Sequence, residues 1–188
     1  MAIVESVTYE NIDFSKEMLA RSEYESCTFL NCNFSNADLS HFIFIDSNFT
    51  DCNLSLVKLV NTIFRDVAFG GCKLIGLQFT DANTFGLSVS FANCILTNAS
   101  FYKTKIKNTK FINSNLSEVD FTEADLTGAN FSQCDLQNAI FDNTILEKVD
   151  FRTSINYQID PERNKIKKSR HNNTELGGLL TKYGIVID

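Results

Sequence analysis

A large apolar residue recurs at every fifth position through most of this chain, and this period limits the fold more than any other feature. Every fifth residue from Phe14 to Phe79, and again from Phe91 to Phe151, is Phe, Leu, Ile or Tyr. We label this position i. Position i−2 is mostly Ala, Ser, Thr or Cys, position i−1 is often Asn or Asp, and position i+1 is often Ser or Thr. Because a period of five fits neither a helix face nor a simple strand, it predicts a chain that turns a corner every five residues, with i and i−2 inward.

A second period, of 20 residues, predicts how these corners stack. After Phe91 the i positions alternate between Phe and Leu or Ile, so residues 20 apart are alike, as in the column Phe91, Phe111, Phe131 and Phe151. Like residues stacked on like are typical of an in-register parallel coil, whose rungs are about 4.8 Å apart. Four corners per coil predict a square solenoid. The two series of i positions are out of step by two residues, which predicts a small insertion.

The six cysteines could be metal ligands, disulfides or small buried residues. All six occupy position i−2: Cys27, Cys32, Cys52, Cys72, Cys94 and Cys134. Free Cys packs as a small hydrophobe, and neither His41 nor His171 is placed to complete a metal site. Parallel thiols stacked 20 residues apart suit the dihedral angle of a disulfide poorly. We therefore expect buried, reduced thiols, no metal and no cofactor.

The repeat resembles that of the pentapeptide-repeat family, which reads A(D/N)LXX, and ADLTGANF from Ala124 to Phe131 shows it clearly. The resemblance implies the family's all-β solenoid, a right-handed quadrilateral β-helix. We divide the chain into an N-terminal cap (1–13), the repeat domain (14–153, with a break at 80–90), and a C-terminal cap and dimerisation segment (154–188). Caps are needed because a solenoid otherwise exposes unpaired strand edges.

The C-terminal sequence NNTELGGLLTKYGIVID predicts a short helix, capped by Asn173 or Thr174 and ended by Gly184. It also resembles the end of the quinolone-resistance (Qnr-type) and microcin-immunity pentapeptide proteins. That resemblance implies a homodimer shaped as a rod that mimics duplex DNA, binds DNA gyrase and topoisomerase IV, and protects them from quinolones or toxins. The dimer residues it implies are Leu176, Leu179, Leu180, Tyr183, Ile185 and Ile187.

The charge distribution agrees with a DNA mimic only in part. Residues 1–160 hold 20 acidic and 11 basic side chains, whereas the remaining residues hold 3 and 6, so the basic tail would interrupt a negative surface. Asp46 and Asp66 are 20 residues apart and place like charges side by side, which is mildly destabilising and hints at a binding face. With Glu118 and Asp120 they form our candidate acidic binding face.

The basic cluster Lys103, Lys105, Lys107 and Lys110 has two interpretations. Glu123 and Asp125 follow Lys103 and Lys105 by 20 residues, and Lys58 follows Asp38 by the same step. On stacked coils these residues would form ion pairs, each worth about 0.2–1 kcal/mol. The alternative is an exposed basic patch that binds a partner.

No enzyme is expected from this sequence. Two histidines leave no Ser-His-Asp or Cys-His set, and GGCKLIG lacks the spacing of a P-loop. A net charge of −6 disfavours nucleic acid as a direct ligand. We see neither a signal peptide nor a stretch long enough to span a membrane, so we expect a cytoplasmic protein. The alternative to topoisomerase binding is a scaffold for another protein.

Overall fold

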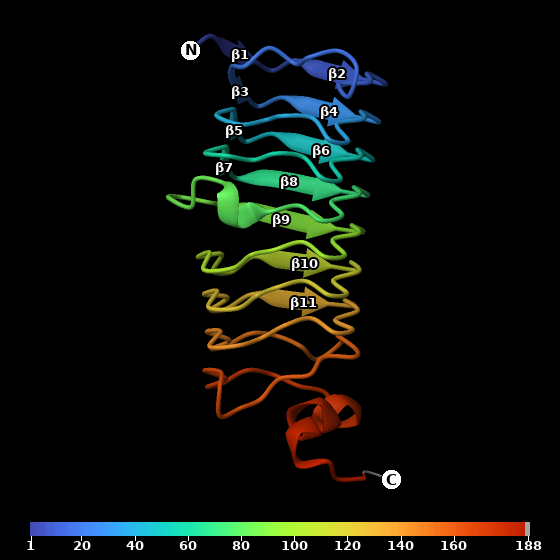
Figure 1. The fold of residues 1–188 in the computed structure, drawn as a ribbon, viewed down its shortest axis with the longest axis vertical. Coiled ribbons are helices and arrows are strands. Elements are labelled where there is room, and N and C mark those ends of the chain that lie inside the picture. Colours follow the sequence, from blue (N-terminus) through green and yellow to red (C-terminus); the bar gives the residue numbers. More distant parts are fainter. Residues whose placement is uncertain (187–188) are drawn as a thin grey trace.

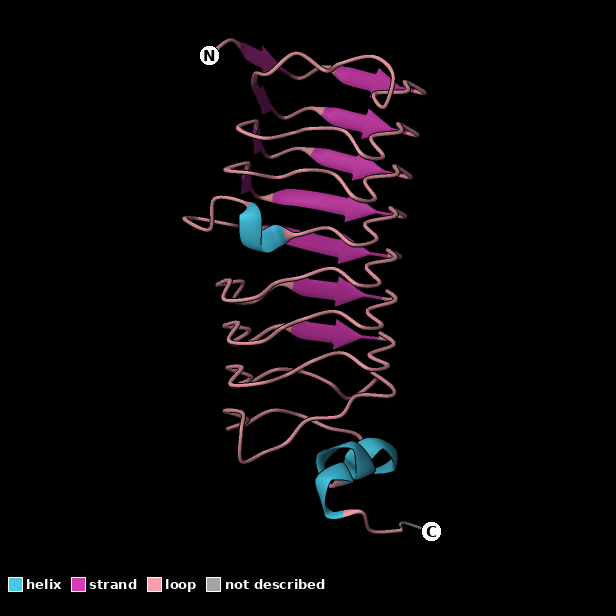
Figure 2. Ribbon diagram, in the orientation of Figure 1, coloured by secondary structure: helices cyan, strands magenta, loops and turns pink. Residues whose placement is uncertain are grey.

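The computed structural model describes residues 1–186 as a four-sided tower of parallel coils, with the N-terminus at one end and the C-terminal helices at the other (Figure 1). One side is a sheet of β1 (Ile3–Glu5), β3 (Glu23–Glu25), β5 (Ile43–Ile45) and β7 (Ile63–Arg65). The next is a longer sheet of β2 (Thr8–Glu10), β4 (Thr28–Leu30), β6 (Asn48–Thr50), β8 (Val67–Gly70), β9 (Val89–Ala92), β10 (Lys110–Ile112) and β11 (Asn130–Ser132) (Figure 2). The other sides are joined by isolated parallel bridges.

The pairing register confirms the predicted period of 20. All strand pairs are parallel, and Phe29 pairs with Phe49 as Phe111 pairs with Phe131. The step becomes 22 between Phe69 and Phe91, where β8 meets β9. The two extra residues are taken up between the 3₁₀ helix η1 (Phe79–Asp81) and β9, in the loop that projects from the tower in Figure 1. The parallel solenoid and its two-residue insertion are therefore both as predicted.

Most corners of the tower are turned by a residue in the left-handed region, two positions after the apolar residue i. Asp46 (φ 47°), Asn61 (φ 55°) and Asn113 (φ 46°) are examples, and Gly71 (φ 64°) takes the same position. Asn, Asp and Gly adopt this region at lower cost than other residues. The abundance of Asn in the chain therefore has a structural cause that the period alone does not reveal.

Polar side chains next to the corners complete the backbone hydrogen bonding. At position i−1 the carboxamide or carboxylate oxygen accepts from the backbone N–H of i+1, as Asn33 does from Ser35 and Asp125 from Thr127 (both 3.1 Å). At position i−2 a buried hydroxyl donates to the carbonyl of the coil before it, as Thr62 does to Leu39 (2.7 Å). These bonds explain why i−1 favours Asn or Asp and i−2 favours small residues.

The core consists of stacked aromatic columns. Phe111 and Phe131 lie 4.8 Å apart with an interplanar angle of 2°, whereas Phe121 meets Phe111 edge to face across the core at 5.9 Å. Both arrangements suit the quadrupole of an aromatic ring. Because each ring is fully buried, the tower interior is a packed core and leaves no room for a channel.

The ends continue the coil further than the sequence suggested. Residues 1–13, expected to be a cap, contribute β1 and β2, which pair with β3 and β4 as an additional rung. Beyond residue 153 the ladder runs on to the bridge between Asp150 and Arg170. It is followed by two 3₁₀ helices, η2 (Asn173–Leu179) and η3 (Thr181–Tyr183). Within residues 1–186, no helix has the length and apolar character needed to cross a membrane.

Candidate interaction surfaces

The C-terminal segment presents an apolar surface beneath the last coil. The predicted cap is off by one residue, because Asn172 accepts from the Thr174 N–H (3.1 Å), while Gly184 ends the segment in the left-handed region as expected (φ 60°). Leu179 packs on the core and Leu180 is half-buried. Leu176, Tyr183 and Ile185 are exposed, as is the neighbouring Val186, which the dimer set omitted. Ile187, also in that set, lies outside the described residues.

Several contacts hold this segment against the tower. The Ile159 N–H donates to the Gly178 carbonyl (2.9 Å), and a Cβ at Gly178 would overlap the Tyr157 carbonyl oxygen. Lys182 Nζ bridges Asp160 Oδ1 (2.8 Å) and Glu162 Oε2 (2.7 Å). The exposed apolar side chains are therefore displayed on an anchored element, which favours a defined interface.

The four residues of the candidate acidic face divide into two sites. Asp46 and Asp66 are exposed corner residues that directly follow β5 and β7, and the Asp66 carboxylate accepts from Ser88 Oγ (2.7 Å). From Asp46 to Glu118 the chain advances 72 residues, two of which are the insertion, so the two positions differ by three and a half coils. Glu118 and Asp120 therefore lie on the opposite side of the tower from Asp46 and Asp66.

The structure adds carboxylates to the Asp46 and Asp66 site. Glu5 in β1 stacks on Glu25 in β3, in the sheet whose strands lead into Asp46 and Asp66. Among the described residues, none of these four acids makes an ion pair. The sequence signal for the additional pair was the same 20-residue step that selected Asp46 and Asp66.

The lysine cluster is partly neutralised by acids of the next coil. Lys103 contacts Glu123 as predicted (3.5 Å), but Asp125 pairs with Lys107 (3.1 Å) and not with Lys105, which meets Asp125 only through the backbone ladder. Burial opposes ionisation of Asp125, yet hydrogen bonds from Thr127 and the Lys107 ammonium together lower its pKa. Asp38 and Lys58 also meet through the backbone, and within residues 1–186 no ion pair joins them.

The thiols and histidines form no recognisable reactive site. All six cysteines are buried and free, and burial raises the pKa of Cys134 to about 11, so this thiol stays protonated. His171 Nε2 lies 2.9 Å from Ser169 Oγ, and its Nδ1 lies 3.0 Å from the Tyr157 hydroxyl. Because the second ring nitrogen faces the Tyr157 hydroxyl and not a carboxylate, Ser169 and His171 do not form a Ser-His-Asp set. No cluster of His, Cys, Asp and Glu able to hold a metal occurs in residues 1–186.

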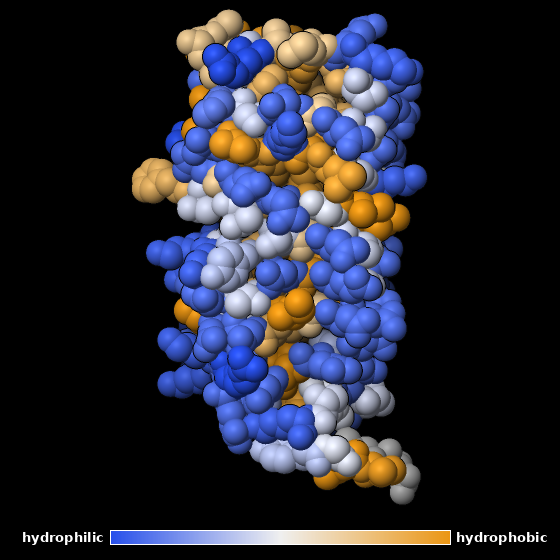
Figure 3. Space-filling model, viewed as in Figure 1, coloured by the Kyte–Doolittle hydropathy of each residue, from blue (hydrophilic) through white to orange (hydrophobic). Residues whose placement is uncertain are grey.

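The loop after η1 carries an unexpected aromatic side chain. Phe85 is 81% exposed near its tip, where the Phe85 N–H donates to Asn83 Oδ1 (3.0 Å). Figure 3 shows hydrophilic residues over most of the visible face, with apolar colour gathered at the C-terminal end and in the N-terminal third. The sequence located the insertion but gave no reason to select Phe85.

Comparisons with known proteins relate this architecture to a protein family and to solved structures. A family model described as "Pentapeptide repeat region" matches residues 22–88 and 85–157. A solved structure of trypsin-treated QnrB1, a plasmid-mediated fluoroquinolone resistance protein, is 19% identical, with 100% of both chains covered and a TM-score of 0.61. HetL, a pentapeptide repeat protein involved in heterocyst differentiation regulation from the cyanobacterium Nostoc, is 15% identical, with 91% of this chain and 86% of HetL covered and a TM-score of 0.66. Among curated proteins no match was found. At these identities the likeness to the solved structures concerns the fold.

Proposed function

The chain belongs to the pentapeptide-repeat family, and from this premise we propose that it is a non-enzymatic protein that acts by presenting its surface to a protein partner. The partner class that we propose is a type II topoisomerase, DNA gyrase or topoisomerase IV, which would bind the acidic side of the tower in place of duplex DNA. The observation that carries the proposal is the set of unpaired carboxylates stacked in the N-terminal half.

The acidic character is concentrated in that half. Residues 1–100 contain 11 acidic and 5 basic side chains, whereas residues 101–188 contain 12 of each, so the net charge of −6 belongs to the first hundred residues. Among the described residues of that half, the one ion pair is Asp13 with Lys16. Carboxylates repeated at the rung spacing of about 4.8 Å produce a negative field that attracts a basic, DNA-binding surface.

Gyrase supercoiling, with and without a quinolone, tests the proposal. The double variant Asp46→Lys, Asp66→Lys removes two carboxylates from the N-terminal site, and we expect it to weaken the effect on gyrase by roughly tenfold or more, because repulsive charges then face the partner. The matched control Glu118→Lys, Asp120→Lys makes the same change on the opposite side and should retain the effect. Absence of any effect of the wild-type protein at micromolar concentration would reject topoisomerase binding.

We also propose a homodimer formed through the C-terminal segment. Leu176, Tyr183, Ile185 and Val186 are exposed on an element fixed by Lys182, and burying such side chains against a second copy would be favourable. Light scattering at tens of micromolar should give a dimer for the wild type and a monomer for Ile185→Asp. A wild-type monomer under these conditions would contradict the interface.

A scaffold for another protein is the second candidate. The balanced charge of residues 101–188 would place a neutral to basic centre between the acidic ends of a C-terminal dimer, which fits a continuous DNA-like rod poorly. Phe85, exposed on the projecting loop, suits the aromatic anchors common in protein interfaces. A partner captured by the wild type but lost with Phe85→Ala, and distinct from a topoisomerase, would favour the scaffold.

A further inference from the structure

The first coil leaves the ladder between residues 16 and 21. Residues 36–41 of the second coil meet residues 55–60 of the third coil through four backbone hydrogen bonds of 2.9–3.0 Å. They run from the N–H of Asn36 to the carbonyl of Ser55, and likewise from Leu39 to Lys58, from Lys58 to Ala37 and from His41 to Val60. Within residues 1–186, none of the four equivalent bonds joins residues 16–21 to the second coil. The pairing resumes only at Ser22, whose carbonyl accepts from the Ile43 N–H (3.3 Å).

The interruption leaves backbone groups of the second coil without a partner. In the described part of the chain, the N–H and carbonyl of Asp38 and the carbonyl of Ser40 make no hydrogen bond, although their counterparts one coil later are all paired. Such a row of free donors and acceptors is the edge that pairs with an added strand. Asp38 is exposed, so another chain can reach these groups.

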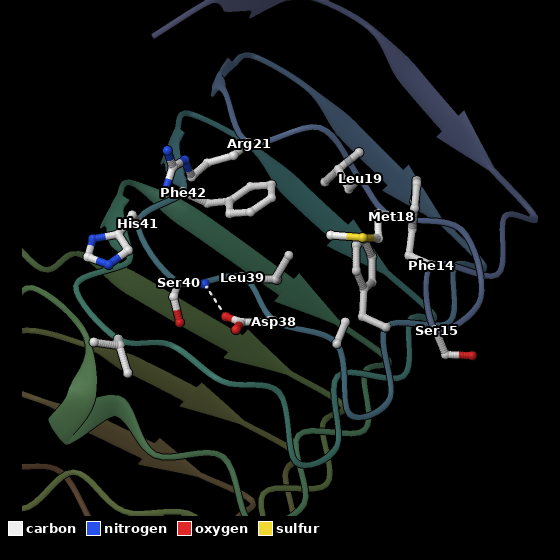
Figure 4. A pocket seen from close by; sticks show the side chains of 13 residues that line it. Phe14, Ser15, Met18, Leu19, Arg21, Asp38, Leu39, Ser40, His41 and Phe42 are labelled. Carbon is white, nitrogen blue, oxygen red and sulfur yellow. Dashed lines mark hydrogen bonds between the residues drawn. The ribbon is translucent and has the colours of Figure 1, made fainter.

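An apolar groove opens beside this edge. It has a volume of about 920 Å³ and an apolar lining of Phe14, Leu19, Leu39 and Phe42, with Arg21 and His41 among its polar lining residues (Figure 4). Ala37 at position i−2 is partly exposed here, whereas Ala99 and Ala124 at the same position in later coils are buried. The groove therefore lies where the missing rung would have placed its own side chains.

The chain does not fill the groove itself, because Glu17 occupies position i−2 of the first coil. In register, its carboxylate would enter the core, and burying an unpaired charge is strongly unfavourable. The corner is instead displaced by one residue, so that Ser15 donates to the Asn33 carbonyl (3.1 Å) and Glu17 to the Asp13 carbonyl (3.0 Å). Met18 is left 94% exposed above the groove.

We propose that this groove binds an extended segment of a partner protein that adds the missing rung by strand addition. The Asp38 N–H donates to the segment, and the carbonyls of Asp38 and Ser40 accept from it. A Leu or Phe of the segment enters the groove above Leu39, and the residue two positions before it is small, as Ala37 and Ala99 are at that position. Basic flanking residues suit the net charge of −6 in residues 1–100. Met18 adapts to the bound side chain.

A labelled synthetic peptide with this pattern tests the proposal. We choose TNASFYKTK, residues 97–105 of this chain, because it places Ala two positions before Phe and carries two lysines. Fluorescence polarisation should show binding. Replacing the Phe with Asp, or methylating the Phe backbone nitrogen, should each weaken binding at least tenfold. If only the Asp peptide lost affinity, the groove would be an apolar pocket without strand addition, and the proposal would be wrong.

Hydrogen exchange and one variant provide independent readouts. In the free protein the Asp38 amide should exchange much faster than the paired Lys58 amide, and the peptide should slow it at least tenfold. Glu17→Ala should let residues 16–21 close the rung and abolish binding, while Glu118→Ala should not. An Asp38 amide already protected in the free protein, or unaffected by bound peptide, would overturn the proposal. If the free protein were a dimer that the peptide dissociates, the occupant of the groove would be a second copy of this chain, and the proposed partner segment would be wrong.

Discussion

At the scale of single residues, the left-handed corners decide which side chains the tower tolerates on its surface. Most corners carry Asn, Asp or Gly, but Leu56 adopts φ 57° with its side chain 60% exposed. A left-handed conformation costs an ordinary L-residue about 1–2 kcal/mol, and an exposed leucine recovers little of this by burial. Asn36 and Gly76, one coil to either side, meet the same backbone requirement with residues suited to it.

We therefore predict that Leu56→Asn stabilises the protein by about 1 kcal/mol, because Asn relieves the backbone cost at this corner. The midpoint of denaturant unfolding, followed by circular dichroism, measures the effect. Ile75→Asn is the matched control, since Ile75 is 37% exposed and its φ is not positive, so no comparable gain is expected there. Equal shifts in the two variants would mean that surface polarity, and not the corner, is responsible.

At the scale of elements, three exceptions to the small residue at i−2 show what the sequence can predict. Phe42 and Leu77 break the rule but are apolar, and both are buried within intact coils. Glu17 breaks it with a charge, and its coil leaves the ladder. The period predicts where each coil lies, and the chemistry of position i−2 could have identified the interrupted one.

The ion-pair partners and the capping residue depend on how far a side chain extends and in which direction, and the coil register does not determine this. Asp125 lies next to Lys105 along the ladder, but its carboxylate pairs with Lys107. The cap on the C-terminal segment, Asn172, precedes two similar candidates, and local backbone angles decide among them. The six buried thiols, by contrast, follow from register alone, because all occupy position i−2.

The C-terminal cap should be sensitive to mild acid through His171. Its ring stacks on Phe151 (5.5 Å), its Nδ1 lies 3.0 Å from the Tyr157 hydroxyl, and burial lowers the pKa of His171 below its usual 6.5. The unfolded chain then binds a proton that the folded chain resists. The contribution to stability is therefore complete above about pH 6.5, the unfolded value, and is lost progressively as the pH falls from there through the lower pKa of the folded state.

Unfolding midpoints measured from pH 8 to pH 5 check this expectation. The wild type should lose stability below about pH 6.5, with a slope no steeper than about 1.4 kcal/mol per pH unit, the limit for one proton. His171→Gln, which keeps a polar side chain but does not titrate, should lack this component. Exposed carboxylates titrate mostly below pH 5, which separates the two effects. Parallel profiles for both proteins would contradict the assignment.

At the scale of the whole molecule, the candidate interaction surfaces lie at different positions along the long axis of the tower. The coils of residues 5–66, which carry the unpaired carboxylates and line the apolar groove, lie toward the N-terminal end, whereas η2 and η3, in the segment that we propose as the dimer interface, lie at the other (Figure 1). The intervening coils, which contain Lys103 and Lys107, set the distance between these surfaces. Because each coil contacts only its neighbours, stability is approximately a sum of coil and interface contributions, and the number of coils can change without changing the ends.

This architecture predicts that the stability lost on deletion depends on whether the 20-residue register is kept, and not on how many residues are removed. Removing residues 101–120 joins Ser100 to Phe121, which then stacks on Phe79 as Phe101 does now (4.6 Å), so every column is preserved. Removing only 101–105 places Ile106 on Phe79 and shifts all later columns by a quarter of a coil. At the junction between the two coils that flank the deletion, Phe then stacks on Leu. Such misfits typically cost about 1–3 kcal/mol at each overpacked position.

We expect the unfolding midpoint to fall in the order wild type, the 20-residue deletion, the five-residue deletion, although the last removes the least protein. Denaturant titrations followed by circular dichroism measure the order. Light scattering checks that both deletion variants have the same oligomeric state. The 20-residue deletion keeps Asp46, Asp66 and the groove, so it should also retain peptide binding. If the five-residue deletion proved the more stable of the two, the stacked columns would matter less than the number of coils, and register would not be the main determinant of this fold.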